Sequence, residues 1–274
     1  MLTLYPVACL CCLKQAEQRD IRGFGGPCSS LALYIGLPPK VRELVDAASF
    51  REFIQTLTVP VRNDHVVLVA LAERWRDTSN TFHLPPGEMT VMLSDFAAIT
   101  GLRVGGEPIP FDSGIHVDPA ALEWFLGEVP QVERGAARGS TVHLSYLPAL
   151  KDLRAASRFD WGGAALGTAY QFFGDASRNG QSMAGYWRVW EVEWNPWRTS
   201  GPEPEYLAQS RVVTASRVLL ESAFGWQWYL GDRVVRQSLG YPEFQVPGPL
   251  PPRASHTGDY TLAELERYTR PDTS

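Results

Sequence analysis

The chain has 274 residues, and its 45% hydrophobic and 20% charged content is ordinary for a globular protein with a sizeable core. Its formal net charge of −5 argues against a chain-wide electrostatic grip on nucleic-acid phosphates. No stretch approaches the roughly 20 consecutive apolar residues that a membrane-spanning helix needs.

The cysteines give no sign of a disulfide framework or a metal site. All four lie near the start of the chain, at Cys9, Cys11, Cys12 and Cys28. A disulfide framework would spread them through the fold, so their clustering favours a reducing compartment. They also lack the paired spacing of a zinc site. We therefore predict no metal and no cofactor.

The chain divides into three parts. Residues 1–30 show no clean hydrophobic period and end in a run rich in Gly, Pro and Ser, which predicts a loosely ordered leader. Residues 31–240 carry helical and strand patterns and are predicted to form one domain. Residues 241–274 begin with dense prolines, which predict a stiff linker, and end in a short helix that opens at the capping box Thr261–Glu264.

Three helices are predicted before the middle of the chain. Pro38-Pro39 opens the first, Ser49–Glu52 forms a capping box for the second, and Asp64 caps the third. Each has apolar residues at intervals of three and four, the spacing of one buried helix face. The predicted buried positions are Val41, Leu44, Val45 and Ala48, then Phe50, Phe53, Ile54 and Leu57, then Leu68, Leu71, Ala72 and Trp75.

A β-hairpin is predicted next. Residues 81–84 and 89–93 flank Pro85-Pro86-Gly87-Glu88, in which a Pro-Gly pair suits a tight turn. This turn pairs Leu84 with Met89 and Phe82 with Val91, placing these apolar side chains on one face with Thr81 and His83 on the other. Ser94 then caps a short helix that has Asp95 in its first turn and ends at Gly101.

Helices alternate with a few strands after the hairpin. Asp118-Pro119 starts one helix, and Asp160 caps another that runs through Phe173. Residues 217–220 and 226–230 are strand-like, and residues 231–240 suggest a short helix ended by Gly240. The predicted fold is therefore mainly α-helical, with a central β-hairpin and a few short strands, at the margin of the α+β class.

The middle of the chain resembles the plant mobile domain, a family carried by plant transposable elements and by cellular proteins similar to Maintenance of Meristems. The resemblance rests on the pattern E-R-W-R, T-x-T-F-H-L-P-x-G-E-M-T, L-x-D-F and G-L, matched between Glu73 and Leu102. Further matches are Thr141–Pro148, Leu150–Leu153, Phe159–Gly162, Gly185–Glu191 and the closing D-R-V-x-R-Q at Asp232–Gln237. The pattern covers roughly residues 31–240, with departures near 127–140 and 195–205.

The resemblance implies a non-catalytic nuclear interaction module. Cellular members of the family act in transposable-element silencing, gene-expression control and meristem maintenance, and they associate with plant phosphoprotein-phosphatase-like proteins. The two departures also fit a transposon-derived remnant. The residues expected to be structural or to form an interface are Arg74, Trp75, Phe82, His83, Gly87, Glu88, Asp95, Trp161, Trp187, Trp190, Arg233 and Arg236.

The family has also been labelled aminotransferase-like, and the sequence argues against that activity. A pyridoxal enzyme needs a lysine for its Schiff base and a phosphate-binding loop. Of the three lysines, only Lys151 lies in a family-like segment, where a solvated face of an amphipathic helix explains it. No glycine-rich loop follows a strand, and the required alternation of strands and helices is absent.

Two alternative functions remain open at the level of sequence. A hydrolase-like site would use His83 and Glu88, which lie near the hairpin turn, whereas Glu88 could instead pair with Arg74 or Arg76. A nucleic-acid-binding module would use Arg233 and Arg236 with exposed aromatic side chains at residues 226–229. The competing interpretation places those aromatic side chains in the core.

Overall fold

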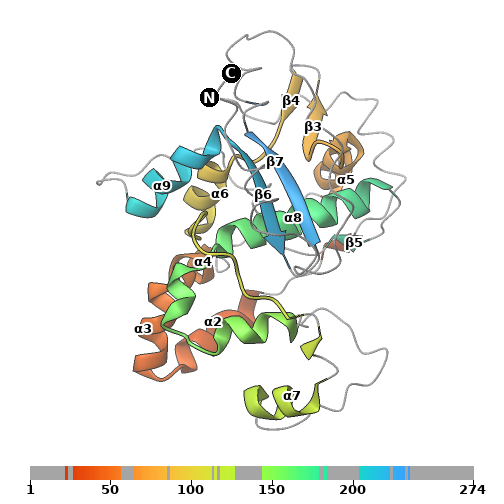
Figure 1. Ribbon diagram of the computed structural model, residues 1–274. Helices are drawn as coiled ribbons and strands as arrows, with labels where there is room; N and C mark the ends of the chain where they lie inside the picture. The colour runs from red at the N-terminus through yellow and green to blue at the C-terminus, as the bar shows by residue number, and fades with distance from the viewer. Residues whose placement is uncertain are drawn as a thin grey trace.

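The computed structural model describes residues 22–23, 27–56, 65–84, 87–112, 114–115, 118–126, 144–178, 182–183, 204–222, 225–231 and 234. These residues form a mainly helical structure with small sheets of two or three strands (Figure 1). This confirms the fold class that the sequence predicts.

The longest of the described helices is α8. In chain order the described helices are α2 (Pro27–Gly36), α3 (Pro39–Ala47), α4 (Phe50–Thr56), α5 (His65–Arg74), α6 (Leu93–Thr100), α7 (Pro119–Leu126), α8 (Trp161–Arg178) and α9 (Glu205–Thr214). Two 3-10 segments, η2 (Leu144–Leu150) and η3 (Ala155–Arg158), precede α8.

The strands form three separate small sheets. The first joins β1 (Arg22–Gly23) to β5 (Ser182–Met183) in parallel. The second has the antiparallel order β2-β3-β4, formed by Trp75–Arg76, Thr81–Leu84 and Gly87–Met89. The third pairs β6 (Arg217–Ser222) with β7 (Gly225–Leu230).

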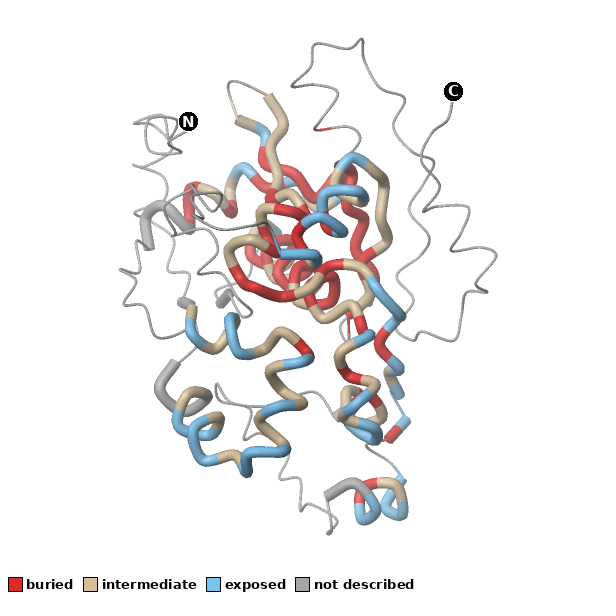
Figure 2. The backbone as a smooth tube through the Cα atoms, turned by 90° about the vertical axis from the view of Figure 1, so that its left-hand side faces the viewer, coloured by how far each residue is buried: buried red, intermediate tan, exposed pale blue. Residues whose placement is uncertain are grey.

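The α8 helix is the element on which the core is built. The β6–β7 hairpin crosses it, and α5 with the β2-β3-β4 sheet lies toward its C-terminal end (Figure 1). Buried positions concentrate in this half of the molecule, whereas α3 and α4 contain no buried residue (Figure 2). The buried face of α8 includes Leu166, Tyr170 and Phe173, each at most 1% exposed.

Aromatic side chains hold the three-stranded sheet to α8. The Trp75 ring lies 4.8 Å from that of Phe82, 5.1 Å from that of Tyr170 and 5.3 Å from that of Phe173. Such contacts stabilise a core beyond the burial of their area. Trp75 is therefore buried as predicted, but it lies on β2 because α5 ends at Arg74.

The hairpin exists, but its predicted register is wrong. Phe82 pairs with Met89, His83 with Glu88 and Leu84 with Gly87, whereas the prediction paired Phe82 with Val91 and Leu84 with Met89. Gly87 has a φ of 132°, a conformation that favours glycine, and it begins β4. A shift of two residues leaves each side chain on its predicted face.

The structure confirms two of the predicted helix ends and contradicts a third. Gly101 ends α6 in the left-handed conformation, with a φ of 72°. Asp118 Oδ1 accepts hydrogen bonds from the backbone N–H groups of Ala120 and Ala121, which confirms it as the cap of α7. The prediction for Ser94 is wrong: α6 begins at Leu93, and the Ser94 N–H donates to Thr214 Oγ1 at 3.0 Å.

Some elements differ from the sequence-based prediction. The α2 helix crosses residue 30, where the leader is predicted to end, and α9 was not predicted. Lys151 lies in a bend between η2 and η3 and not on an amphipathic helix, although it is exposed as predicted. The α8 helix continues five residues past Phe173, to Arg178.

Candidate functional site: the anchored hairpin

The outer face of the β2-β3-β4 sheet carries His83 and Glu88, the two residues of the hydrolase alternative. His83 Nε2 lies 3.6 Å from Glu88 Oε1, and the two side chains are 43% and 13% exposed. Thr81 Oγ1 donates a hydrogen bond to Glu88 Oε2 at 3.3 Å. Glu88 therefore contacts His83 and Thr81, while Arg76 makes no ion pair within the described part of the chain.

Within the described residues, the hydroxyl groups bonded to Glu88, directly or through Thr81, are buried. The two hydroxyl groups beside the pair are those of Ser79 and Thr81, which bond to each other at 2.7 Å. Ser79 is 6% exposed and Thr81 is fully buried, so no substrate could reach the Thr81 hydroxyl. Within the described residues there is also no group of three His, Cys, Asp or Glu side chains that could hold a metal ion.

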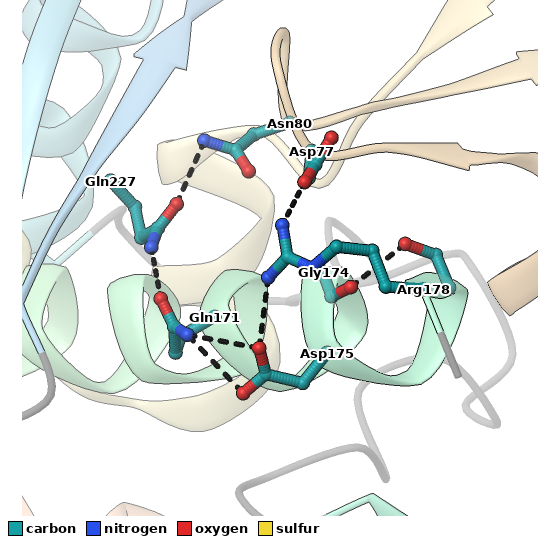
Figure 3. A network of polar contacts seen from close by, with 8 residues as sticks. Asp77, Asn80, Gln171, Gly174, Asp175, Arg178 and Gln227 are labelled. Atoms are coloured by element: carbon teal, nitrogen blue, oxygen red, sulfur yellow. Dashed lines mark hydrogen bonds and ion pairs between the residues drawn. The ribbon is translucent and has the colours of Figure 1, made fainter. Parts of the chain in front are cut away.

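A chain of polar side chains lies beneath the hairpin, between the β2–β3 turn, α8 and β7 (Figure 3). Asn80 Nδ2 donates to the Trp228 carbonyl oxygen at 2.9 Å and to Gln227 Oε1 at 3.3 Å. Gln227 Nε2 donates in turn to Gln171 Oε1. Asn80 is 2% exposed and has a φ of 52°, which asparagine tolerates better than most residues.

The same chain continues to the surface through a charged segment. Gln171 Nε2 donates to both oxygens of Asp175 at 3.2 Å, and Arg178 Nη2 donates to Asp175 Oδ1 at 2.9 Å. Arg178 Nη1 pairs with Asp77 Oδ2, on the β2–β3 turn (Figure 3). Hydrogen bonds that run in one direction polarise each other and are strengthened at low local dielectric.

The turn approaches α8 closely because of Gly174. A Cβ atom on this glycine would lie 3.3 Å from the Asp77 Cβ and 3.5 Å from Arg178 Nη2. A larger residue would push the turn away from the helix and lengthen the bond between Asp77 and Arg178. The polar chain and the aromatic contacts therefore bind the hairpin to α8 from two sides.

Tyr170 connects the hairpin to the core of α8. Its hydroxyl donates to the Val91 carbonyl oxygen at 3.0 Å and lies 2.8 Å from Thr90 Oγ1. Thr90 Oγ1 also donates to the Asn80 carbonyl oxygen at 2.9 Å. Burial raises the pKa of Tyr170 above its ordinary value, so the side chain stays neutral and acts as a structural hydrogen-bonding group.

The predicted residues that the structure describes differ in how far they are buried. Trp75 and Phe82 are buried in the core, at 2% and 3% exposure. Trp161 is half-buried, and its indole N–H donates to the Ala156 carbonyl oxygen at 2.8 Å. Arg74 and His83 are exposed, whereas Gly87, Glu88 and Asp95 are intermediate. The remaining predictions, Trp187, Trp190, Arg233 and Arg236, lie outside the described residues.

The aromatic side chains that the nucleic-acid alternative would use for stacking on bases are buried. Trp226 is 9% exposed, Trp228 is 4% exposed and Tyr229 is fully buried. Their rings cannot stack on nucleotide bases from these positions. The competing interpretation, that these aromatic residues are core residues, is confirmed.

Sequence reasoning missed the residues of the polar chain beneath the hairpin. Asn80 and Gln227 are separated by 147 residues, and Gln171 lies on a helix whose pattern suggests only close packing. A glutamine within the otherwise apolar and aromatic strand Gly225–Leu230 is the one signal that could have indicated a buried polar partner.

Comparisons with known proteins found a family model and several proteins of Arabidopsis thaliana that part of the chain matches. Residues 49–143 match the plant mobile domain model, and this segment contains the hairpin, α6 and α7. The chain is 31% identical over 189 residues to Protein MAIN-LIKE 2 of Arabidopsis thaliana, covering 53% of this chain and 28% of that protein. It is 28% identical over 186 residues to Protein MAINTENANCE OF MERISTEMS of the same plant, covering 52% and 38%.

A third relative is of a different kind. The Serine/threonine-protein phosphatase 7 long form homolog of Arabidopsis thaliana is 26% identical over 161 residues, covering 43% of this chain and 12% of that protein. The chain thus spans less than two fifths of the length of any of these three relatives. No solved structure matches it. Residues 49–143 of the chain are thus similar to the plant mobile domain, the family that the sequence motifs resemble.

Proposed function

We propose that this chain is a non-catalytic interaction module of the plant mobile domain type that acts in the nucleus. The observation that carries the proposal is that the polar side chains in and beneath the β2-β3-β4 sheet form hydrogen bonds with other parts of the fold. Thr81, Asn80 and Gln227 are buried and bonded within the fold, and the only charged group that contacts exposed His83 within the described part of the chain is Glu88. The buried residues Thr81, Asn80 and Gln227 stabilise the fold and are not available to a substrate, and the exposed His83 lies 3.6 Å from Glu88.

The proposed partner is a protein of the phosphoprotein-phosphatase type. One relative is by name a phosphatase 7 long form homolog, which supports a link between this domain and such phosphatases. A domain that occurs beside a phosphatase in one chain can bind a similar phosphatase supplied separately. The meristem relatives support a role in meristem maintenance, to which we add the silencing of transposable elements.

The proposed contact surface is the exposed outer edge of the hairpin. Arg76 on β2 and His83 on β3 both point away from the Trp75–Phe82 face, because residues directly opposite in the ladder share a face. Arg76 makes no ion pair in the described structure, so its guanidinium can pair with a carboxylate of a partner. Arginine is one of the residues that most often dominates binding energy in an interface.

Calorimetric titration of the purified chain with a plant phosphatase-7-like protein tests this proposal. We expect micromolar or tighter binding for the natural chain and about a tenfold weaker affinity for the double variant Arg76→Ala/His83→Ala. Arg154→Ala is the matched control, because Arg154 is exposed in the turn directly before η3. No binding at tens of micromolar, or equal affinities for all three proteins, would refute the proposed partner or surface.

A separate assay tests the proposal that the chain is non-catalytic. The natural chain, His83→Ala and Glu88→Gln would be assayed against carboxylic ester, phosphate ester and peptide substrates. We expect no hydrolysis above the uncatalysed rate for any of the three. A turnover that His83→Ala and Glu88→Gln both abolish would establish the hydrolase alternative.

A further inference from the structure

An arginine stands three residues before a hydroxyl side chain at several places in the described part of the chain. These places are Arg76 with Ser79, Arg154 with Ser157 and Arg211 with Thr214. Protein kinases that select basic substrates recognise this spacing, because carboxylates of the kinase pair with the arginine while the hydroxyl receives the phosphate. The structure distinguishes these hydroxyl groups by whether a kinase can reach them.

Two of these hydroxyl groups are held within the fold. Ser79 is 6% exposed, and its hydroxyl lies 2.7 Å from Thr81 Oγ1. Thr214 Oγ1 donates to the carbonyl oxygen of the buried Ser210 at 2.8 Å and accepts the Ser94 N–H at 3.0 Å. A phosphate on Ser79 would bury a charge without solvent, and a phosphate on Thr214 would break both of its hydrogen bonds.

The hydroxyl of Ser157 lies at the surface. It donates to the Arg154 carbonyl oxygen at 3.2 Å, in an exposed hydrogen bond on η3. Arg154 and Arg158, which flank it in the sequence, are both exposed. Only this one exposed bond must break for the hydroxyl to turn toward a kinase, so Ser157 is the accessible acceptor among the three.

The 3-10 conformation of η3 places the Arg154 side chain beside Ser157. A 3-10 helix has about three residues per turn, so side chains three residues apart lie one above the other. Arg154 directly precedes η3 and already has a helical backbone, with a φ of −72° and a ψ of −32°. Its guanidinium makes no ion pair within the described part of the chain. Its donors are therefore available to a phosphate on Ser157 Oγ.

We propose that Ser157 is a phosphorylation site for an arginine-directed serine kinase, and that Arg154 binds the resulting phosphate. The kinase transfers the γ-phosphoryl group of ATP to Ser157 Oγ. The new bond joins Oγ to phosphorus, the bond from this phosphorus to the oxygen bridging the β-phosphate breaks, and ADP leaves. The hydroxyl proton passes to a base of the kinase. This site is independent of the proposed function.

The phosphate would also change the charges on the segment between α6 and α8. Arg158 Nε lies 3.5 Å from Glu107 Oε1, and the two side chains are 62% and 54% exposed. Solvent screens this pair, so a phosphate on the residue before Arg158 competes with Glu107 for its guanidinium. The backbone contact persists, because the Glu107 N–H donates to the Arg158 carbonyl oxygen at 2.9 Å. We expect altered surface charge without separation of the two segments.

Incubation of the full chain with magnesium ATP and a calcium-dependent protein kinase that selects arginine at this spacing tests the site. Peptide mass spectrometry should locate the phosphate on Ser157, and Ser157→Ala should remove it. Ser79 and Thr214 are internal controls, because they have the same arginine spacing without the exposed hydroxyl, and both should remain unmodified. No phosphate on Ser157, or an equal yield on Ser79 or Thr214, would overturn the proposal.

Phosphorus-31 NMR of the phosphorylated chain tests the role of Arg154. A nearby guanidinium favours the doubly charged phosphate, so the second pKa of this phosphate should fall below about 6, its ordinary value, and return toward it in 1 M sodium chloride. Arg158→Ala keeps Arg154 and should keep the lowered pKa. A pKa at or above the ordinary value in the natural chain, or a lowering that Arg158→Ala abolishes, would contradict binding by Arg154.

Discussion

Asn80 Nδ2 donates a hydrogen bond to the carbonyl oxygen of Trp228 at 2.9 Å, which joins the β2–β3 turn to β7 across 148 residues of sequence. The bond is buried, and Asn80 also has a positive φ of 52°. The residue therefore supplies both the turn conformation and the link between two sheets.

Replacing Asn80 separates these two roles. Asn80→Ala loses the side-chain donor and adopts the left-handed conformation at a cost, so we expect a loss of about 2–4 kcal/mol in the free energy of unfolding. Asn80→Gly also loses the donor but tolerates the conformation, so its loss should be smaller by about 1 kcal/mol. Urea unfolding at neutral pH measures both. Equal losses would show that the backbone conformation contributes nothing.

Among the residues of the β2-β3-β4 sheet, Trp75 is expected to be the one whose truncation destabilises the fold most. Its ring contacts Phe82, Tyr170 and Phe173, and it is 2% exposed. Trp75→Ala should cost about 3–5 kcal/mol, while Trp75→Phe keeps part of the aromatic contact and should cost less. Thermal unfolding followed by circular dichroism distinguishes them. A Trp75→Ala variant as stable as the natural chain would contradict the described packing.

Gly162 is expected to tolerate no side chain. A Cβ atom there would lie 2.5 Å from the Arg103 carbonyl oxygen, which is backbone and cannot rotate away. Gly162→Ala should therefore lose about 1–3 kcal/mol of stability. Gly36→Ala at the end of α2 is the control, since nothing lies within 4 Å of the added Cβ, and it should be neutral or slightly stabilising. Denaturant midpoints that move together in the two variants would count against the close approach.

The ion pair between Arg178 and Asp77 should contribute little to stability. The two side chains are 44% and 32% exposed, and solvent screens such pairs. Arg178→Ala is expected to lose at most about 1 kcal/mol at low salt, and the loss should shrink at 1 M sodium chloride. A loss above about 2 kcal/mol that salt does not change would indicate that the pair behaves as a buried network.

Local patterns predicted much of the fold correctly. The α3 helix begins at Pro39 as the Pro38-Pro39 pair indicates, Asp118 caps α7 and Gly101 ends α6, because these signals act within one helical turn. The Ser94 cap failed because the apolar residue Leu93 already begins the helix. The hydroxyl of Thr214, on α9, then accepts the hydrogen bond from the Ser94 N–H.

The candidate site was less predictable than the fold. The sequence placed His83 near Glu88 because neighbouring strands bring such residues together, and the structure confirms their contact. The predicted register was wrong because Gly87, expected at the centre of the turn, pairs with Leu84 as the first residue of β4. Asn80, Gln171 and Gln227 could not be predicted, because their bonds join distant segments and depend on packing that no short window contains.

Amide hydrogen exchange of residues 75–93 tests most directly whether the hairpin's polar and aromatic residues serve to hold it to α8. We expect the backbone amides of Trp75, Phe82 and Leu84 in the β2-β3-β4 sheet to exchange at rates close to those of the buried part of α8. Asn80→Ala should accelerate the exchange of these three amides at least tenfold while leaving α8 protected. Rapid exchange of the hairpin in the natural chain, with α8 protected, would contradict an anchored hairpin. It would indicate instead that the side chains are held loosely and are available for chemistry.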